Sequence, residues 1–257
     1  MNINPSASNS PQPFILGADL LGKLESFSSG IFLSDNVDDQ MVCDFVLVLA
    51  LVFNDLQSVI WARDKLRNLT EGKKFIYSKT WGLIGGLHII SWRYVCGIFN
   101  ELIEAIRSNK IVFDKSIWKR LLAKIPKEDQ ENWNEVLNLT QESGGKDSVF
   151  RILRQYRHNI AFHYYGSGKH LRSGLKKYSI DNPNVGCLLS RGDNILSTRY
   201  YFADAAAQQY MALVADENTF DRNLAEPAKK LARLLRNLVE SFIFVRGGSV
   251  REFRENS

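Results

Sequence analysis

Two long segments of helical periodicity constrain the fold of this chain more than any other feature. Between about Asp38 and Leu69, apolar residues recur three or four positions apart, which places them on one face of a helix. This face consists of Val42, Phe45, Val46, Leu49, Phe53, Leu56 and Ile60. A second helix is predicted from about Thr80 to Ser108. Its apolar face consists of Ile84, Leu87, Tyr94, Ile98, Leu102 and Ile106. A polar break at 71–74 separates the two segments, so we expect the helices to pack antiparallel.

Five shorter amphipathic segments extend the helical pattern. We predict helices over residues 114–123, 127–140, about 147–165, 203–215 and 226–245. In the last of them Pro227 is tolerated in the first turn. Its apolar face consists of Leu231, Leu234, Leu235, Leu238 and Phe242. Gly85 and Gly86 weaken the second long helix, and we expect them to let another backbone come close.

One region departs from the helical pattern. The short runs Gly186–Ser190 and Ser197–Phe202 flank a Gly, Asp and Asn cluster that turns the chain, which predicts a small β-hairpin. No internal repeat or compositional shift marks a second domain. We therefore predict an all-α antiparallel helical bundle with a β-hairpin insertion, in which residues 1–36 are an N-terminal tail and lead-in segment and residues 37–257 are a single domain.

Composition and apolar runs indicate a cytoplasmic protein. The 257 residues are 45% hydrophobic and 24% charged, which is ordinary for a globular chain, and the net charge of +5 weakly favours an acidic partner such as RNA. Residues 1–13 resemble no secretory signal or mitochondrial presequence. The longest apolar run, Phe45–Phe53, is shorter than the ~20 residues that span a bilayer, so we expect a core helix and no membrane partner.

Residues 154–165 concentrate the side chains suited to acid-base chemistry on a phosphate. They include Arg157, His158 and His163, and so hold half of the chain's four histidines. An arginine provides a permanent charge with planar donors that match phosphate, and a histidine titrates near neutral pH. Together they can drive phosphodiester cleavage without a metal or a cofactor, and we predict neither.

The segment resembles the motif of the HEPN superfamily, in which an Arg is followed after four to six residues by a His, with a polar residue beside the Arg and often a Tyr two after the His. Arg157, His158, His163 and Tyr165 fit this pattern. The resemblance implies a helical bundle that forms a homodimer across the motif. It also implies a metal-independent endoribonuclease of toxin–antitoxin or antiphage-defence type, with Arg157 and His163 as catalytic residues.

His163 would accept the proton of the ribose 2′-hydroxyl or donate a proton to the leaving 5′-oxygen, while Arg157 stabilises the phosphorane. The products would carry 2′,3′-cyclic phosphate ends. Six residues of helix separate the two side chains by roughly 120° and ~9 Å, so a twofold dimer would bring them together more easily than one chain. We expect His158 and Asn159 to have supporting roles. Tyr165 matches the tyrosine that a nucleotidyltransferase antitoxin modifies with AMP in some relatives, which suggests a cognate antitoxin as a partner.

Two groups of cations could contact RNA. Lys169, Arg172, Lys176 and Lys177 follow the motif directly and would lie near any RNA held there. Lys229, Lys230, Arg233 and Arg236 lie opposite the leucine face of the last predicted helix, where a solvated surface is the simpler interpretation and phosphate contacts are the alternative.

Two other interpretations of the motif stay open. The first is a noncatalytic HEPN-like module that binds RNA, a nucleotide or a protein. The second is a structural helical dimer, in which cations at a helix C-terminus meet exposed carbonyls and the aromatic residues simply pack.

Overall fold

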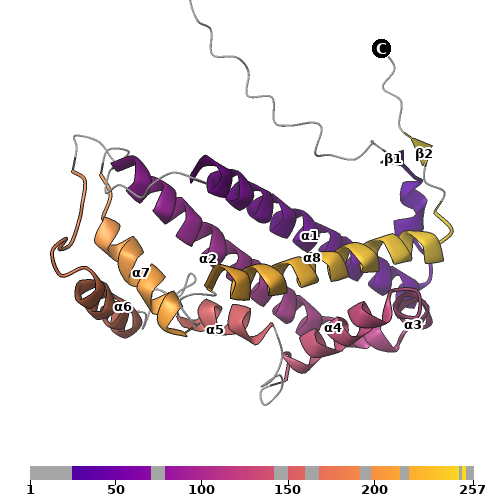
Figure 1. Ribbon diagram of the computed structural model, residues 1–257. Coiled ribbons are helices and arrows are strands. Elements are labelled where there is room, and N and C mark those ends of the chain that lie inside the picture. Colours follow the sequence, from indigo (N-terminus) through magenta and orange to yellow (C-terminus); the bar gives the residue numbers. More distant parts are fainter. Residues whose placement is uncertain are drawn as a thin grey trace, which may run out of the picture.

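The computed structural model describes residues 25–70, 79–141, 150–159, 168–191, 198–214, 220–248 and 251–252. These residues are mostly helical, which confirms the predicted all-α class (Figure 1). The α-helices are α1 (Val37–Thr70), α2 (Lys79–Ser108), α3 (Ser116–Leu122), α4 (Lys127–Asn138), α5 (Arg151–Asn159), α6 (Gly168–Asp181), α7 (Tyr201–Val214) and α8 (Phe220–Val245). Two 3₁₀ turns, η2 (Ser29–Phe32) and η3 (Lys110–Asp114), precede α1 and follow α2.

Helices α1 and α2 pack antiparallel, as predicted. The Arg63 guanidinium of α1 lies 4.1 Å from the centre of the Trp92 ring of α2. Near the opposite end of α1, Asp38 forms an ion pair of 2.6 Å with Lys115, which follows α2 in the chain. Helices α1 and α2 therefore run in opposite directions. The side chain of Asn36 caps α1 by accepting a hydrogen bond of 3.1 Å from the amide of Asp39.

Helix α8 packs along α1 and completes the long framework of the bundle (Figure 1). Its predicted leucine face is confirmed, because Leu231, Leu234, Leu235, Leu238 and Phe242 are all fully buried. The helix begins six residues before the expected start, at Phe220, so Pro227 lies inside it rather than in its first turn. The burial of Leu224 and Ala228 on either side of the proline offsets the backbone hydrogen bond that proline cannot make.

The core face of α2 differs from the predicted face. Leu102 and Ile106 are buried as expected, but Leu87 and Tyr94 are exposed. The face that packs in the core consists of Ile89, Trp92, Val95, Cys96, Phe99, Leu102, Ile103 and Ile106. Helix α2 has large apolar residues on nearly all sides, so periodicity alone could not identify the face that the neighbouring helices cover.

Aromatic side chains fill the end of the bundle at which α3 and α4 lie. The Trp118 ring is 5.2 Å from Trp133, 5.4 Å from Phe45 and 5.4 Å from Phe113, measured between ring centroids. Trp118, Trp133 and Phe45 are almost completely buried. Because large aromatic side chains dominate core energetics, this cluster holds α1, η3, α3 and α4 together.

At the opposite end of the bundle, α6 and α7 pack against each other and α7 contacts α2 (Figure 1). Helix α6 was not predicted, because Gly168 and Gly174 interrupt the apolar pattern. In the region of the predicted β-hairpin the structure describes a single antiparallel bridge, between Ser190 and Arg199. Tyr201 and Phe202 already belong to α7 rather than to a second strand, and residues 192–197 lie outside the described ranges.

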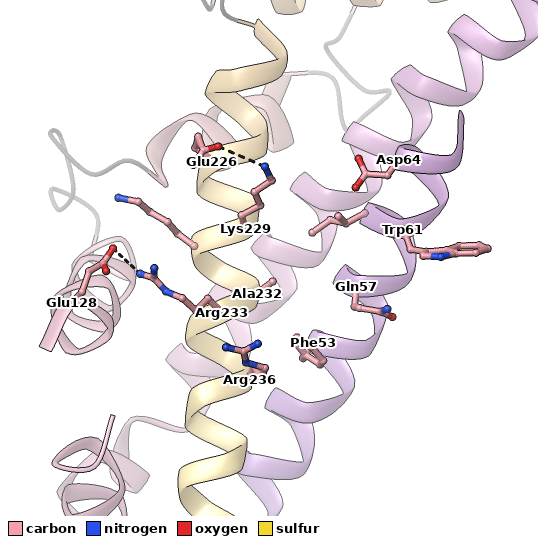
Figure 2. Close-up of a pocket in the computed structure, with 12 residues that line it drawn as sticks. Phe53, Gln57, Trp61, Asp64, Glu128, Glu226, Lys229, Ala232, Arg233 and Arg236 are labelled. Carbon is pink, nitrogen blue, oxygen red and sulfur yellow. Dashed lines mark ion pairs between the residues drawn. The ribbon is translucent and has the colours of Figure 1, made fainter. Parts of the chain in front are cut away.

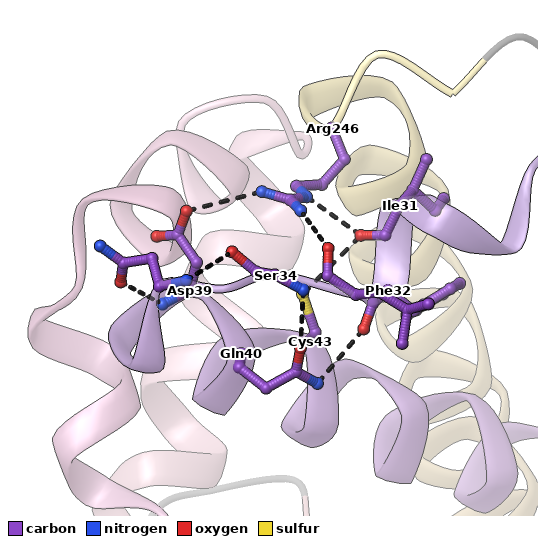
Figure 3. Close-up of polar contacts among 9 residues, drawn as sticks. Ile31, Phe32, Ser34, Asp39, Gln40, Cys43 and Arg246 are labelled. Atoms are coloured by element: carbon purple, nitrogen blue, oxygen red, sulfur yellow. Dashed lines mark hydrogen bonds and ion pairs between the residues drawn. The ribbon is translucent and has the colours of Figure 1, made fainter.

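The lead-in segment is fixed to the end of α8 (Figure 3). Arg246 donates hydrogen bonds of 3.0 Å and 3.2 Å to the carbonyls of Ile31 and Leu33, and it pairs with Asp39 at 3.5 Å. The Phe32 ring lies 5.1 Å from the ring of Phe242. Nearby, the two-residue strands β1 (Glu25–Ser26) and β2 (Arg251–Glu252) pair antiparallel. Segments from both ends of the described chain therefore meet at one end of the bundle.

By length and composition alone, α1 over Val37–Asn68 and α2 over Gly82–Ser108 could each cross a membrane. Core helices of soluble proteins pass the same test, and one face of α1 is buried in the core. In the most apolar stretch of α1 the buried share is 28%, and Leu47, Val48 and Leu51 are exposed. The absence of a membrane partner stays a prediction.

Candidate functional site

Helix α5 carries the first part of the predicted motif and is firmly anchored. Phe150, just before the helix, stacks on Phe99 of α2 with ring centroids 5.9 Å apart, and Leu153 is fully buried. Arg154 donates a hydrogen bond of 2.8 Å to the carbonyl of Leu139, at the end of α4. These contacts fix the direction in which α5 leads toward the motif.

The structure places only part of the motif. The backbone of Arg157, His158 and Asn159 forms the last turn of α5, but their side chains are not described. His163 and Tyr165 lie outside the described residues. The structure therefore neither brings the two predicted catalytic side chains together nor separates them.

Helix α6 presents three of the four predicted RNA-binding cations on one exposed face. Lys169, Arg172 and Lys176 are spaced three and four residues apart and are all exposed. Lys177 is partly buried and forms an ion pair of 3.1 Å with Asp181, one turn later. The first three side chains are thus free to reach a phosphate, whereas the charge of Lys177 is partly compensated.

The opposite face of α6 packs closely on α7. A Cβ atom on Gly174 would lie 1.9 Å from the carbonyl oxygen of Ala206, so only glycine allows this approach. The His170 ring lies 4.8 Å from the ring of Tyr210, and His170 is partly buried. This histidine packs on α7.

A polar pair that the sequence did not indicate lies between the start of α7 and α2. Arg199 donates from Nε to Asp204 at 3.0 Å, and its guanidinium lies against Gly86. A Cβ atom on Gly86 would lie 1.7 Å from Arg199 Nη2, whereas one on Gly85 would meet no atom of the described part of the chain within 4 Å. The expectation of a close backbone at this glycine pair is therefore wrong, because a side chain occupies the space.

The environment of this pair is partly desolvated. Burial raises the pKa of Asp204 above its usual value, while Arg199 and Arg93 act in the opposite sense. A desolvated carboxylate beside an arginine is typical of a structural link as well as of an active site. We assign it the structural role, because it fixes Arg199, just before α7, to that helix while the Arg199 side chain packs against Gly86 of α2.

Among the residues that the structure describes, no three His, Cys, Asp or Glu side chains converge as a metal-binding group. Comparison of the chain with family models, with curated proteins and with solved structures finds no match.

Proposed function

We propose that this chain is a metal-independent endoribonuclease of toxin or antiphage-defence type, acting in the cytoplasm with Arg157 and His163 as its catalytic residues. The observation that supports it is the position of the motif between two well-packed helices. Helix α5, anchored through Phe150 and Leu153, leads into the motif, and α6 follows it with three exposed cations.

The reaction that suits these residues is transesterification. His163 accepts the proton of the 2′-hydroxyl, the 2′-oxygen attacks phosphorus, and the bond to the 5′-oxygen breaks as that oxygen takes up a proton from a second histidine. Arg157 stabilises the negative charge of the phosphorane. The products are a 2′,3′-cyclic phosphate and a 5′-hydroxyl. His158, Asn159 and Tyr165 support the site by orienting a histidine or contacting a phosphate oxygen.

A homodimer completes this proposal. On an ideal helix Arg157 and His163 would be roughly 120° apart around the axis, so residues from two copies of the chain would converge more readily on one phosphate. The second histidine would then be His163 of the other copy. A sedimentation measurement that finds only monomers at the concentrations used for cleavage would exclude the shared site.

The cations of α6 would hold the RNA beside the motif. Lys169, Arg172 and Lys176 would contact phosphates without reading the base sequence, so binding should weaken as the salt concentration rises. Lys177 should contribute less, because Asp181 already neutralises part of its charge.

The test is cleavage of labelled cellular RNA in EDTA by wild type, Arg157→Ala, His163→Ala and His170→Ala. His170 is the matched control, because it is a histidine close to the motif that packs on Tyr210. We expect a loss of about 10²- to 10⁴-fold for His163→Ala, little change for His170→Ala, and 2′,3′-cyclic phosphate ends in the wild-type products.

Equal cleavage by wild type and His163→Ala would reveal a contaminant or a different active site. Binding of RNA without cleavage by the wild type would favour the noncatalytic module. A cognate nucleotidyltransferase, if it is the antitoxin, should add AMP to Tyr165, and peptide mass spectrometry would locate that group.

A further inference from the structure

A groove of about 740 Å³ runs between α1 and α8 (Figure 2). Its volume is in the range of sites that bind small molecules or short polymer segments. Its lining residues are Phe53, Gln57, Ile60, Trp61 and Asp64 of α1, Glu128 of α4, and Glu226, Lys229, Lys230, Ala232, Arg233 and Arg236 of α8.

The groove has an apolar floor. Phe53 and Ile60 of α1 and Ala232 of α8 are partly buried and pack against the core. The small side chain of Ala232 leaves space between the two helices, and Phe53 of α1 and Arg236 of α8 both line the groove (Figure 2). Trp61 is at the rim, with its ring directed away from α8 (Figure 2). The floor thus offers flat apolar contacts to a ligand.

The wall formed by α8 is cationic, and its four positive side chains are not equivalent. Arg233 is fixed by two carboxylates, Glu128 at 2.6 Å and the buried Asp129 at 3.1 Å. It therefore serves mainly to join α8 to α4. Lys229 lies 3.7 Å from Glu226, and both side chains are more than half exposed, so this ion pair contributes little to stability.

Lys230 and Arg236 are the cations best able to receive a ligand. Arg236 is 3.8 Å from Glu240, again with both side chains more than half exposed. For Lys230 the described residues provide no ion pair within 4.0 Å. Two long cationic side chains therefore border an apolar floor.

Cations beside an apolar floor suit a polyanion that carries flat apolar rings. Single-stranded RNA has this chemistry, because its phosphates bind lysine and arginine while its bases stack on apolar and aromatic side chains. An acidic protein helix would use the cations but not the flat contacts of Phe53. The charge of the lining, four cations against three carboxylates, favours an anion of either kind.

We propose that the groove is a second RNA site, in which Lys230 and Arg236 contact phosphates while bases lie against Phe53 and Ile60. The identity of the ligand rests on the proposed function, but the groove itself does not include the motif. RNA held there would extend the bound length of the substrate beyond the nucleotides that flank the cleaved bond.

The experiment measures binding of fluorescein-labelled single-stranded RNA by fluorescence anisotropy over a range of salt concentrations, in the His163→Ala background. The test variant is Lys230→Gln with Arg236→Gln. The control is Lys119→Gln with Arg120→Gln, which removes the same charge from two exposed residues of α3. Thermal melts confirm that each variant is folded.

We expect the groove variant to bind more weakly and the slope of log K against log salt to fall in magnitude by about 1.4, since each single-strand phosphate contact contributes about 0.7. The control should keep the wild-type slope. Equal changes in both variants would mean a general charge effect and would overturn the proposal. Displacement of the RNA by polyglutamate as effectively as by unlabelled RNA would also overturn it, in favour of an acidic protein partner.

Cleavage assays with His163 present separate this proposal from the proposed function. If the groove variant cleaves RNA with an unchanged KM, the nuclease proposal stands and the proposal of an RNA site in the groove is wrong. If the wild type cleaves no RNA but the groove variant binds RNA more weakly, the groove is an RNA site and the proposed nuclease activity is wrong.

Discussion

The two ends of the bundle are held together by different means. At one end, α3 and α4 pack through large buried aromatic side chains, with Trp118 and Trp133 at the centre. At the other end, α6 and α7 meet at Gly174, where backbone touches backbone, and the Arg199–Asp204 pair at the start of α7 packs against Gly86 of α2. The first end owes its stability to apolar burial, and the second depends on close approach and a polar link.

The candidate RNA-binding cations Lys169, Arg172 and Lys176 lie at the second end. Regions with few large buried side chains open at lower free energy than the core, and binding elements are often drawn from them. We therefore expect α6 and α7 to separate from the bundle before the aromatic end unfolds. Three sets of substitutions test this difference.

The largest effect should come from Trp118→Ala. The substitution removes a buried ring that contacts three other aromatic rings, so it should lower the free energy of unfolding by about 3–5 kcal/mol. Chemical denaturation monitored by circular dichroism measures the change. Trp118→Phe is the control: it keeps a ring and removes an indole N–H without a hydrogen-bond partner among the described residues, so it should cost much less. A loss confined to α3 and α4 in hydrogen exchange would contradict the assignment of this cluster to the global core.

An intermediate effect is expected for Gly174→Ala. The new Cβ would collide with the backbone carbonyl of Ala206, which cannot move without separating the two helices, and overpacking of this kind costs about 1–3 kcal/mol. Gly168→Ala is the control within the same helix, because a Cβ there meets none of the described residues within 4 Å. Hydrogen exchange with mass spectrometry should show lost protection in α6 and α7 and unchanged protection in α1. Equal loss in α1 would mean that the two ends unfold as one unit.

The smallest change in stability is expected for alanine substitutions of the adjacent glycines of α2, and its sign should differ between the two positions. Gly85→Ala should stabilise the protein by about 0.5–1 kcal/mol, because the position is helical and open. Gly86→Ala gains the same helix propensity but displaces Arg199 from Asp204, leaving a partly desolvated carboxylate that costs about 1–3 kcal/mol. Melting temperatures of the two variants should move in opposite directions. An upward shift in both would show that the ion pair contributes nothing.

Much of the helical framework follows from the sequence. The face of α8 was predictable because apolar residues on one side alternate with polar residues on the other, as at Leu231 and Leu235 against Arg233 and Arg236. The expected face of α1 is also in the core, although Leu47, Val48 and Leu51 make its exposed side apolar as well. The face of α2 was not predictable, because apolar residues surround that helix. Helix α6 was missed because its contact with α7 is made by Gly174, and a missing side chain leaves no apolar signal.

The candidate site is less accessible to sequence reasoning than the helices. Lys169, Arg172 and Lys176 are exposed on one face of α6, and their role in RNA binding stays a prediction. The partner of Lys177 is Asp181, one helical turn later. The groove depends on the pairing of α1 with α8, residues far apart in the sequence, so Phe53 and Arg236 could not be recognised as neighbours. The cations of α8 could be recognised in the sequence, but the apolar floor beside them could be recognised only in the structure.

The bond from Arg246 to the carbonyl of Ile31 spans 215 residues, and this has a consequence for synthesis. The chain is made from its amino terminus, so α1 and α2 leave the ribosome long before α8 exists. Until α8 arrives, the faces of α1 and α2 that it covers remain uncovered, and the lead-in segment has its hydrogen bonds to Gln40 and Cys43 of α1, but not those to Arg246, to hold it. The bundle therefore closes only after α8 and Arg246 have been translated.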